Sequence, residues 1–580
     1  MKILLISVNA SFSHSSLAVR SLKVFADQFL SEKENSSLKE KTQIQIEEFT
    51  INQPILEVLR KIAFSQADLV LFSTYIWNAE FICKLIPEVK KLLPKSLIGA
   101  GGPEFSYAAQ KYLSQFFSLD FVIFGEGEIV FTDLIKNFCD FDFSSFSEED
   151  FIQKIKKINS VYFKNHGKIE FTKTQPLIEN LDLLPFAYPE IIEKNYSSLD
   201  HKILYYESSR GCPFSCSYCL SSVDKSVRLK SLDKVFKELQ YFLDGNFPLV
   251  KFVDRTYNLK SERYIEIWRY ILNHHNKKTM FHFEIEAEFL SDEALDFLQN
   301  VPAGIMQFEM GVQSSNPKTL KSVNRSENTK ILKEKILRIP RTIHQHLDLI
   351  AGLPYENLES FGKSYDFVMS LKPDALQLGF LKVLGGTQME SYAKENGWKW
   401  MQTPVYECLS TPYLSFEDVD FLKRIEILTD AYWNKDLFGK TVSYIFKVLS
   451  PWKFLSELCN FATKKGAFLQ ARKDLWYFNL LFEFFVEIEK TNTFNELNFL
   501  LLKDLLRYDF VKTGKKGAFP DWYEHLYDKE KHRILLEKND MLGNSRIGFA
   551  FSEFEQFSFD VESENPEDHP GHFEKLIKYS

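Results

Sequence analysis

Short apolar runs alternate with amphipathic helical segments over the first 170 residues of the chain. The runs are nearly continuous in Val, Ile, Leu and Phe, which is typical of parallel strands covered by helices on both faces of a sheet. The pattern predicts an α/β domain with a doubly wound parallel sheet. The expected strands are residues 2–9, 43–50, 68–73, 97–100 and 121–124.

Small and polar residues follow three of these strands. They are Ser73-Thr74, Gly101-Gly102-Pro103 and Gly125-Glu126-Gly127-Glu128. Ligands of doubly wound sheets bind beyond the carboxyl ends of the strands, where glycine lets the backbone approach a bulky ligand and helix N-termini receive its phosphate or amide groups. We therefore expect a ligand site at this edge of the sheet.

The apolar periodicity breaks over residues 176–194, where Pro176, Pro185 and Pro189 indicate a linker between domains. A second series of alternating strands and helices follows the linker. Its six expected strands are residues 203–209, 249–254, 280–288, 304–313, 343–352 and 375–382.

Polar side chains alternate along three strands of this second series. Because helices cover the outside of a parallel sheet of this kind, a polar face is expected to line a lumen, which would hold a polar site. Antiparallel strands with one wet face are the alternative. The alternating residues are His282, Glu284, Glu286 and Glu288, then Gln307, Glu309, Gly311 and Gln313, then His344, His346 and Asp348.

Beyond residue 389 the alternation stops, and the sequence to residue 580 is mostly helical in pattern and rich in Phe, Trp and Leu. Aromatic stripes at helical spacing are typical of a hydrophobic core. The expected organisation is therefore a first domain at 1–175, a linker at 176–194, a second domain at 195–389 and a helical C-terminal domain at 390–580.

Composition narrows the classes of function. The chain has 580 residues and a formal net charge of −8, which disfavours nucleic acid and anionic membranes as partners. No apolar run approaches the roughly 18 residues of a membrane helix. We expect a soluble, cytoplasmic protein with no membrane span.

Three of the seven cysteines lie within eight residues, as Cys212, Cys216 and Cys219 with the spacing C-x3-C-x2-C. In a cytoplasmic protein such a cluster indicates metal ligands rather than disulfides. Three thiolates suit a cluster of four irons that leaves one iron free to bind a substrate or cofactor. Zinc is the alternative, but it normally needs a fourth Cys or His, which no nearby residue supplies.

This segment resembles the signature of the radical S-adenosylmethionine (SAM) superfamily, including the aromatic Tyr218 before the last cysteine. Further matches are Gly311-Val312-Gln313-Ser314, Asn324-Arg325 and Gly352-Leu353-Pro354. The resemblance implies a partial (β/α)6 barrel. It also implies a 4Fe-4S cluster on the three cysteines, whose open iron chelates SAM and cleaves it reductively to methionine and a 5′-deoxyadenosyl radical.

The same resemblance implies the SAM-binding residues. Backbone near Tyr218 is expected to approach the adenine. The Gly-Gly-Glu segment of the family is absent, and Asp254-Arg255-Thr256 stands in its place. The candidates for binding SAM are Tyr218, Asp254, Glu284, Gln313, Ser314 and Gly352.

The first domain resembles the cobalamin-binding domain of one large class of radical SAM proteins. The fingerprint Asp-x-His-x2-Gly is absent, and His14 stands without its partners, so cobalt is expected to lack a lower histidine ligand. A flavodoxin-like domain that has lost its ligand is the alternative. The residues expected at cobalamin are Ser73, Thr74, Gly101, Gly102, Gly125 and Glu126.

The whole arrangement resembles a cobalamin-binding radical SAM subgroup that ends in a domain of unknown function. It implies an enzyme that methylates an unactivated carbon of a small-molecule or peptide substrate, with a reductant such as flavodoxin or ferredoxin. Radical cyclisation or rearrangement without methylation is a second hypothesis. Modification of tRNA is a third, which the net charge disfavours, and a cobalamin sensor without enzymatic activity is a fourth.

Overall fold

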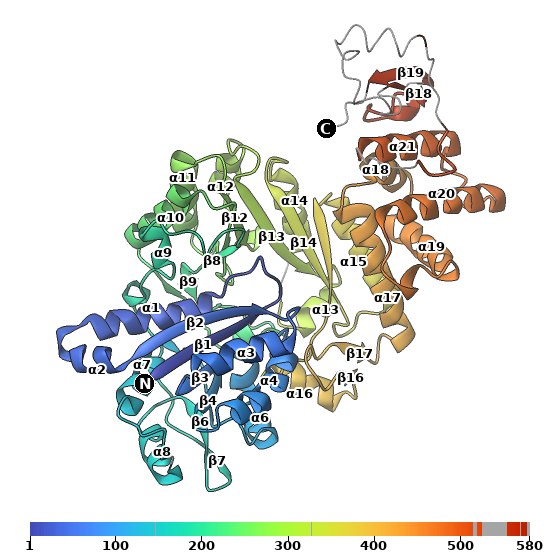
Figure 1. Cartoon of the computed structure of the whole chain (residues 1–580). Helices are drawn as coiled ribbons and strands as arrows, with labels where there is room; N and C mark the ends of the chain where they lie inside the picture. The colour runs from blue at the N-terminus through green and yellow to red at the C-terminus, as the bar shows by residue number, and fades with distance from the viewer. Residues whose placement is uncertain are drawn as a thin grey trace.

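Two parallel sheets with flanking helices lie side by side, and a largely helical region follows them (Figure 1). We analysed a computed structural model. It describes residues 1–145, 147–325, 328–513, 519–524, 530, 554–568 and 570–576.

The first sheet has the strand order β2-β1-β3-β4-β5-β6-β7, and its first five strands are parallel, as predicted. The antiparallel pair β6 and β7 was not predicted. Its strands are short and half-exposed at the edge, so they lack the continuous apolar run of the others. The strands are β1 (Lys2–Asn9), β2 (Gln43–Thr50), β3 (Leu69–Ser73), β4 (Leu97–Gly101), β5 (Phe121–Ile123), β6 (Val161–Asn165) and β7 (Lys168–Phe171).

Helices cover both faces of this sheet and bury a separate hydrophobic cluster on each. Val58, Ile82 and Phe105 pack on one face, and Val19, Phe131 and Ile155 pack on the other. The helices are α1 (Leu17–Ser31), α2 (Ser36–Lys41), α3 (Ile55–Ser65), α4 (Ala79–Leu92), α5 (Pro103–Tyr107), α6 (Ala109–Gln115), α7 (Glu128–Phe138) and α8 (Glu148–Ile155).

The second sheet confirms the six predicted strands. All its pairs are parallel, which makes the antiparallel alternative wrong, and the first and last strands do not pair, so the barrel is open. The strands are β8 (Leu204–Tyr206), β11 (Leu249–Phe252), β12 (Met280–Glu284), β13 (Met306–Gln313), β14 (His344–Ala351) and β15 (Ala375–Phe380).

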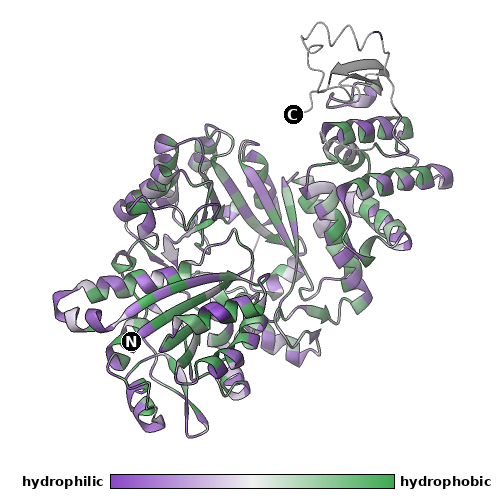
Figure 2. Cartoon of the chain, viewed as in Figure 1, coloured by the Kyte–Doolittle hydropathy of each residue, from purple (hydrophilic) through white to green (hydrophobic). Residues whose placement is uncertain are grey.

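Helices follow the barrel strands and cover the outer face of the sheet (Figure 1). Polar and apolar residues alternate along β13 and β14, with the apolar set buried under the helices (Figure 2). Strand β12 ends at Glu284, so Glu286 and Glu288, which were predicted to belong to this strand, lie beyond its end. The helices are α10 (Leu232–Gly245), α11 (Ser261–His274), α12 (Asp292–Leu298), α13 (Pro317–Ser322), α14 (Thr329–Arg338) and α15 (Leu358–Ser370).

The C-terminal region is mostly helical, as expected, and shares one continuous hydrophobic core with the barrel. Two short antiparallel pairs inside it were not predicted, namely β16 with β17 and β18 with β19. Within the described residues, no helix has the length and apolar character that crossing a bilayer requires. The elements are α16 (Gln388–Glu395), β16 (Lys399–Trp400), β17 (Cys408–Ser410), α17 (Phe416–Thr429), α18 (Gly439–Val448), α19 (Pro451–Lys464), α20 (Asp474–Thr491), α21 (Phe499–Lys512), β18 (Phe554–Phe559) and β19 (Pro570–Leu576).

The start of the C-terminal region returns to the barrel and lengthens its sheet. Lys382 and Glu407 form an antiparallel bridge. The Cys408 amide donates to the Leu381 carbonyl at 2.8 Å, and the Val383 amide donates to the Tyr406 carbonyl at 2.9 Å. This segment therefore covers the sheet edge next to β15.

A buried carboxyl ties the end of β13 to helix α15. Glu356 is fully buried, and its Oε1 accepts hydrogen bonds from the hydroxyls of Ser314 at 2.6 Å and Ser364 at 2.9 Å. Burial raises the pKa of Glu356 to about 7, although the two hydroxyls lower it. The folded chain therefore holds this carboxyl protonated well above the pH at which the unfolded chain releases the proton.

We predict that Glu356→Gln removes a pH dependence of stability. The pKa of Glu356 is about 7 in the folded chain, against 4.5 for an unperturbed glutamate. The free energy of unfolding therefore falls by about 3 kcal/mol in total as pH rises between these two values. The difference in unfolding midpoint, variant minus wild type, should grow between pH 5 and pH 8. Glu359→Gln, an exposed change at the start of helix α15 just after Glu356, serves as control, and parallel midpoint curves for Glu356→Gln and wild type would contradict the assignment.

Candidate functional site

The cysteine loop leaves the first barrel strand through a clamped turn. Buried Asp254 accepts hydrogen bonds from the Ser208 amide at 3.0 Å and from the hydroxyls of Ser208 at 2.6 Å and Ser209 at 2.5 Å. Gly211 has φ +92°, and a Cβ there would lie 2.1 Å from the Ser226 carbonyl oxygen. The backbone next to Cys212 is therefore fixed and has no room for a side chain at Gly211.

All three cysteines of the loop line one cavity at the carboxyl ends of the barrel strands, about 200 Å³ in volume. The remaining walls come from the cysteine loop itself and from residues within or after strands β11 to β14. They are Phe214, Tyr218, Ser221, Ser222, Arg255, Thr256, Glu284, Ile285, Glu286, Glu309, Gly311, Gln313, Arg325 and Asp348.

The arrangement of the thiols fits a cluster of several irons. Among the described residues, no three His, Cys, Asp or Glu side chains converge on a single metal ion. A cubane instead needs thiolates spread around a cavity, each on its own iron, and that is how the cysteines lie. Burial raises the pKa of Cys216, and neighbouring Arg325 lowers it, so a positive charge is in place to favour the thiolate.

Carboxylates dominate the charge of the lumen below the cysteines. Glu309 accepts a hydrogen bond from His282 at 3.0 Å, which lowers the pKa of Glu309. Burial raises the pKa of Glu284 to about 7 despite nearby Arg255. Burial also raises the pKa of Asp348 well above its usual range, with further increases from the charges of Glu309 and Glu284. The polar face predicted from the strand alternation therefore does line a lumen.

The predicted SAM residues divide into two groups. Tyr218, Glu284 and Gln313 line the cysteine cavity. Asp254 and Ser314 are buried, and their side chains are bonded inside the protein, Asp254 to the strand end and Ser314 to Glu356. Neither Asp254, Ser314 nor Gly352 is among the residues that line the cavity.

The structure adds polar residues that the sequence did not single out as ligands. Arg255 and Thr256 line the cavity directly after Asp254, and the Thr256 hydroxyl lies 3.6 Å from the Cys212 sulfur. Arg325 pairs with Glu286 at 2.9 Å and donates to the Gly311 carbonyl at 2.5 Å. Both arginines had a usable signal, because Arg325 lies in a family motif and Arg255 lies in the segment that replaces Gly-Gly-Glu.

A second cavity, about 680 Å³, lies between the two sheets. Its first-domain walls come from the carboxyl ends of β1, β3 and β4, at the point where the strand order reverses between β1 and β3. Ligands of doubly wound sheets bind at this switch point. Tyr205, Arg210 and Arg255 of the barrel form part of the opposite wall.

Five of the six predicted cobalamin residues line this second cavity, namely Ser73, Gly101, Gly102, Gly125 and Glu126. Thr74 does not. It is fully buried, and its hydroxyl donates to the Gly101 carbonyl at 2.8 Å, which fixes the turn between β3 and β4.

The cavity is open to a flat cofactor on the side of the glycines, because a Cβ at Gly125 would meet no atom within 4 Å. Tyr75 and Trp77 form a stacked pair in the wall, with ring centroids 4.3 Å apart. His14 also lines the cavity, but its Nδ1 is hydrogen-bonded to the Tyr205 hydroxyl at 2.5 Å. The residues present therefore fit a large planar group.

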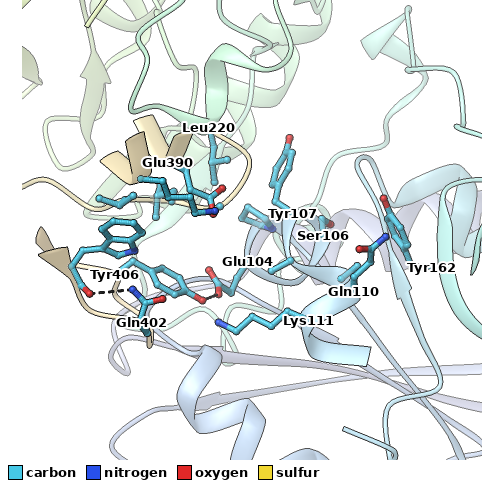
Figure 3. Close-up of a pocket in the computed structure, with 18 residues that line it drawn as sticks. Glu104, Ser106, Tyr107, Gln110, Lys111, Tyr162, Leu220, Glu390, Gln402 and Tyr406 are labelled. Atoms are coloured by element: carbon cyan, nitrogen blue, oxygen red, sulfur yellow. Dashed lines mark hydrogen bonds and ion pairs between the residues drawn. The ribbon is translucent and has the colours of Figure 1, made fainter. Parts of the chain in front are cut away.

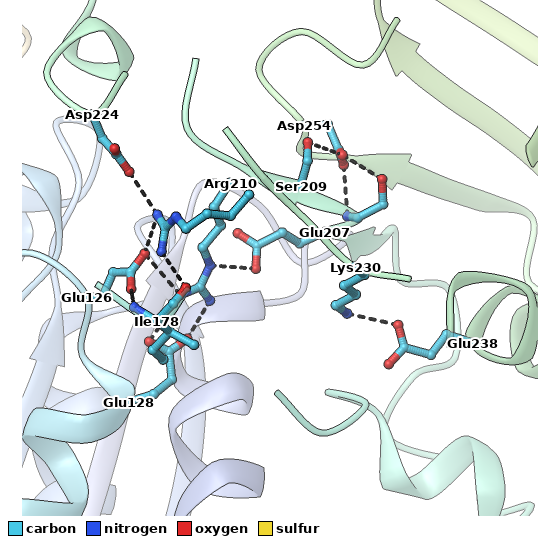
Figure 4. A network of polar contacts seen from close by, with 12 residues as sticks. Glu126, Glu128, Ile178, Glu207, Ser209, Arg210, Asp224, Lys230, Glu238 and Asp254 are labelled. Carbon is cyan, nitrogen blue, oxygen red and sulfur yellow. Dashed lines mark hydrogen bonds and ion pairs between the residues drawn. The ribbon is translucent and has the colours of Figure 1, made fainter. Parts of the chain in front are cut away.

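Buried ion pairs join the two domains beside the switch-point cavity (Figure 4). Arg210 pairs with Glu128 at 2.5 Å, Glu207 at 2.8 Å and Glu126 at 3.5 Å. Arg228 pairs with Glu126 at 2.8 Å. Two arginines of the barrel thus hold Glu126. The segment predicted to contact cobalamin therefore also joins the first domain to the barrel.

Comparison with protein families divides the chain into three matched parts. Residues 36–135 match the B12 binding domain, residues 206–368 match the Radical SAM superfamily, and residues 394–570 match a protein of unknown function family, DUF4080. The first two matches contain the switch-point glycines and the cysteine loop respectively.

Curated relatives share this similarity at low identity. An uncharacterized methyltransferase from Pyrococcus horikoshii is 22% identical over 351 residues, which cover 59% of this chain and 72% of that protein. The anaerobic magnesium-protoporphyrin IX monomethyl ester cyclase of Cereibacter sphaeroides is 22% identical over 339 residues, which cover 56% of this chain and 53% of the cyclase. The match therefore spans only about half the length of the cyclase.

Among solved structures, the cobalamin-dependent SAM radical enzyme OxsB, with aqua-cobalamin and SAM bound, superimposes with a TM-score of 0.57 at 14% identity. The match covers 95% of this chain and 82% of OxsB, so it extends over all three parts. The chain therefore combines a B12 binding domain, a radical SAM domain and a DUF4080 domain, and this combination is that of an enzyme whose cofactors are a 4Fe-4S cluster, SAM and cobalamin.

Proposed function

We propose that this enzyme methylates an unactivated carbon of its substrate. The observation that carries the proposal is that Arg255 lines both the cysteine cavity and the switch-point cavity, so the two cofactor sites adjoin. When bound, the cluster with SAM supplies a 5′-deoxyadenosyl radical, and cobalamin carries the methyl group. Adjoining cavities would let one substrate carbon meet both cofactors.

The chain's own residues would divide the work as follows. The three loop cysteines hold the cluster. Glu284 and Gln313 bind the amino and carboxylate groups of SAM, and backbone at Tyr218 contacts its adenine. Asp254 and Ser314 act as positioning residues, because each fixes a strand end next to the cavity. Gly352, with φ +93° at the end of β14, makes a turn that packs against Cys408.

In the switch-point cavity, backbone at Ser73, Gly101, Gly102 and Gly125 would contact cobalamin, while the barrel arginines hold Glu126 in place. Thr74 supports this turn from behind. We infer that cobalt would lack a lower histidine ligand, because His14 stands without the other residues of the cobalamin fingerprint.

The domain limits that we propose remain 1–175, 195–389 and 390–580, with a linker at 176–194. We propose a small molecule or a peptide as substrate and a flavodoxin or ferredoxin as reductant. Because the thiolate ligands require a reducing compartment, we place the enzyme in the cytoplasm.

A non-methylating radical cyclisation is the second candidate. It is favoured by the similarity to magnesium-protoporphyrin IX monomethyl ester cyclase, although that match covers only 53% of the cyclase. Both candidates use the same cavities, so only the fate of the methyl group distinguishes them.

The first test of the proposed function concerns the cysteines. Cys216→Ala should lose iron and the cleavage of SAM to 5′-deoxyadenosine, because one iron loses its thiolate. The same variant should retain cobalamin with an unchanged cobalt(II) paramagnetic resonance spectrum without nitrogen coupling. Cys139→Ala, which removes a thiol outside the loop, should behave as wild type. Undiminished SAM cleavage by Cys216→Ala would show that the loop does not hold the catalytic cluster.

The second prediction concerns Gly102, which has φ +102°. A Cβ there would lie 2.5 Å from the Thr74 carbonyl oxygen, so Gly102→Ala must shift the turn at the cavity. We expect cobalamin affinity to fall about tenfold or more, as followed by absorption after gel filtration. Gly167→Ala is the matched control, because Gly167 has φ +80° and no atom would lie within 4 Å of its Cβ. If both variants retained cobalamin equally, the assignment of cobalamin to this cavity would be wrong.

The third prediction separates methylation from cyclisation. The reconstituted holoenzyme, a chemical reductant and SAM labelled in its methyl group are incubated anaerobically with a metabolite extract of source cells that lack the gene. Mass spectrometry should find the label on a carbon of a consumed metabolite. Label recovered in methionine alone, with a metabolite consumed, would favour cyclisation or rearrangement.

A further inference from the structure

A third cavity, about 670 Å³, is built by all three parts of the chain (Figure 3). Helices α5 and α6 of the first domain supply one wall, including Tyr107 and Lys111. Residues 383–385, which leave the barrel, supply a second wall. Trp400 and Tyr406 of the DUF4080 region supply a third. Its volume suits a small organic molecule.

This cavity borders both cofactor sites. Pro103 lines it and also lines the switch-point cavity of cobalamin. Leu220 lines it and directly follows Cys219, whose side chain lines the cluster cavity. A molecule held here would lie next to both cofactors without occupying either site.

Close contacts hold the third wall against the first domain. The hydroxyl of Tyr406 donates to Glu104 and lies 3.1 Å from the hydroxyl of Tyr112. Next to the second wall, Gly386 approaches the first domain so closely that a Cβ there would lie 2.9 Å from the ring of Tyr107. The DUF4080 segment is therefore a fixed part of the cavity.

Among the charged side chains that line the third cavity, one cation is available to pair with a ligand. The carboxylate of Glu104 accepts the two tyrosine hydroxyls. Glu390 pairs with Lys394 at 2.7 Å and accepts from the Gly386 amide at 3.1 Å. Lys111 has no carboxylate within ion-pair distance in the described part of the chain, and its ammonium lies over the ring of Tyr406, 5.3 Å from the centroid.

We propose that this cavity is the substrate site and that the DUF4080 segment at 394–406 forms its selective wall. The substrate class is a molecule with a flat aromatic part, which Tyr107 and Trp400 contact, and an anionic group, which pairs with Lys111. The inference rests on the proposed function and deepens it, because it assigns the substrate of the same reaction to this third cavity.

The test uses 8-anilinonaphthalene-1-sulfonate, an anionic aromatic fluorophore, as probe. The holoenzyme is first saturated with cobalamin and SAM, so that the two cofactor cavities are occupied. We expect Lys111→Glu to weaken probe binding about tenfold or more, as measured by fluorescence titration, since charge attraction turns into repulsion. Trp400→Phe should reduce energy transfer from tryptophan to the bound probe.

Lys91→Glu is the matched control, because it makes the same charge change on exposed helix α4, away from the cavity, and should leave probe binding unchanged. Equal probe affinity for Lys111→Glu and wild type would overturn the inference while the proposed function stands. Loss of cobalamin from Lys111→Glu would also overturn it, because the cavity would then belong to the cofactor. Failure of the wild-type chain to bind cobalamin would instead contradict the proposed function.

Discussion

The buried contact between Arg210 and the acidic segment at Glu126 and Glu128 sets the relation between the two cofactor domains. Both partners are largely removed from water, so neither charge is stable without the other. Burial acts to lower the pKa of Arg210, but the surrounding carboxylates outweigh it and raise that pKa well above its usual value. A displaced domain would leave an uncompensated charge inside the protein, and this cost selects one docking arrangement.

Arg210 has this effect because of its place in the chain. It directly precedes Gly211 and Cys212, while Glu126 and Glu128 flank the start of helix α7, next to the switch-point cavity. The same ion pairs therefore hold both the cysteine loop and the edge of the first sheet that lines the switch-point cavity. A second contact supports them, since the Ile203 amide donates to the Ser13 carbonyl at 2.6 Å and joins the loop after β1 to the barrel.

Local patterns predicted most of the fold and only part of the site. The parallel strands were found because each is a continuous or alternating apolar run, whereas β6 and β7 at the exposed edge are too short and too polar to stand out. The cysteine loop is a local motif and was found in full. Residue type did not reveal where a side chain points. Asp254 and Ser314 were therefore expected to bind SAM, whereas their side chains are hydrogen-bonded to other residues of the protein. Pairs such as Arg210 with Glu128, 82 residues apart, leave no local signal.

The difference between local patterns and long-range contacts also explains why the C-terminal region gave no functional signal in the sequence. Its helices share a core with the barrel, so their aromatic residues are accounted for by packing. The segment that the proposal assigns to substrate binding is the short return at β16 and β17, whose position depends on backbone pairing with residues 381–383. That pairing brings Tyr406 to Glu104, 302 residues away, and closes the third cavity, in which we propose that the substrate binds. On the proposed assignment, this domain can change the substrate while both cofactor sites stay the same, because neither the three loop cysteines nor the switch-point glycines are among the residues that line the third cavity.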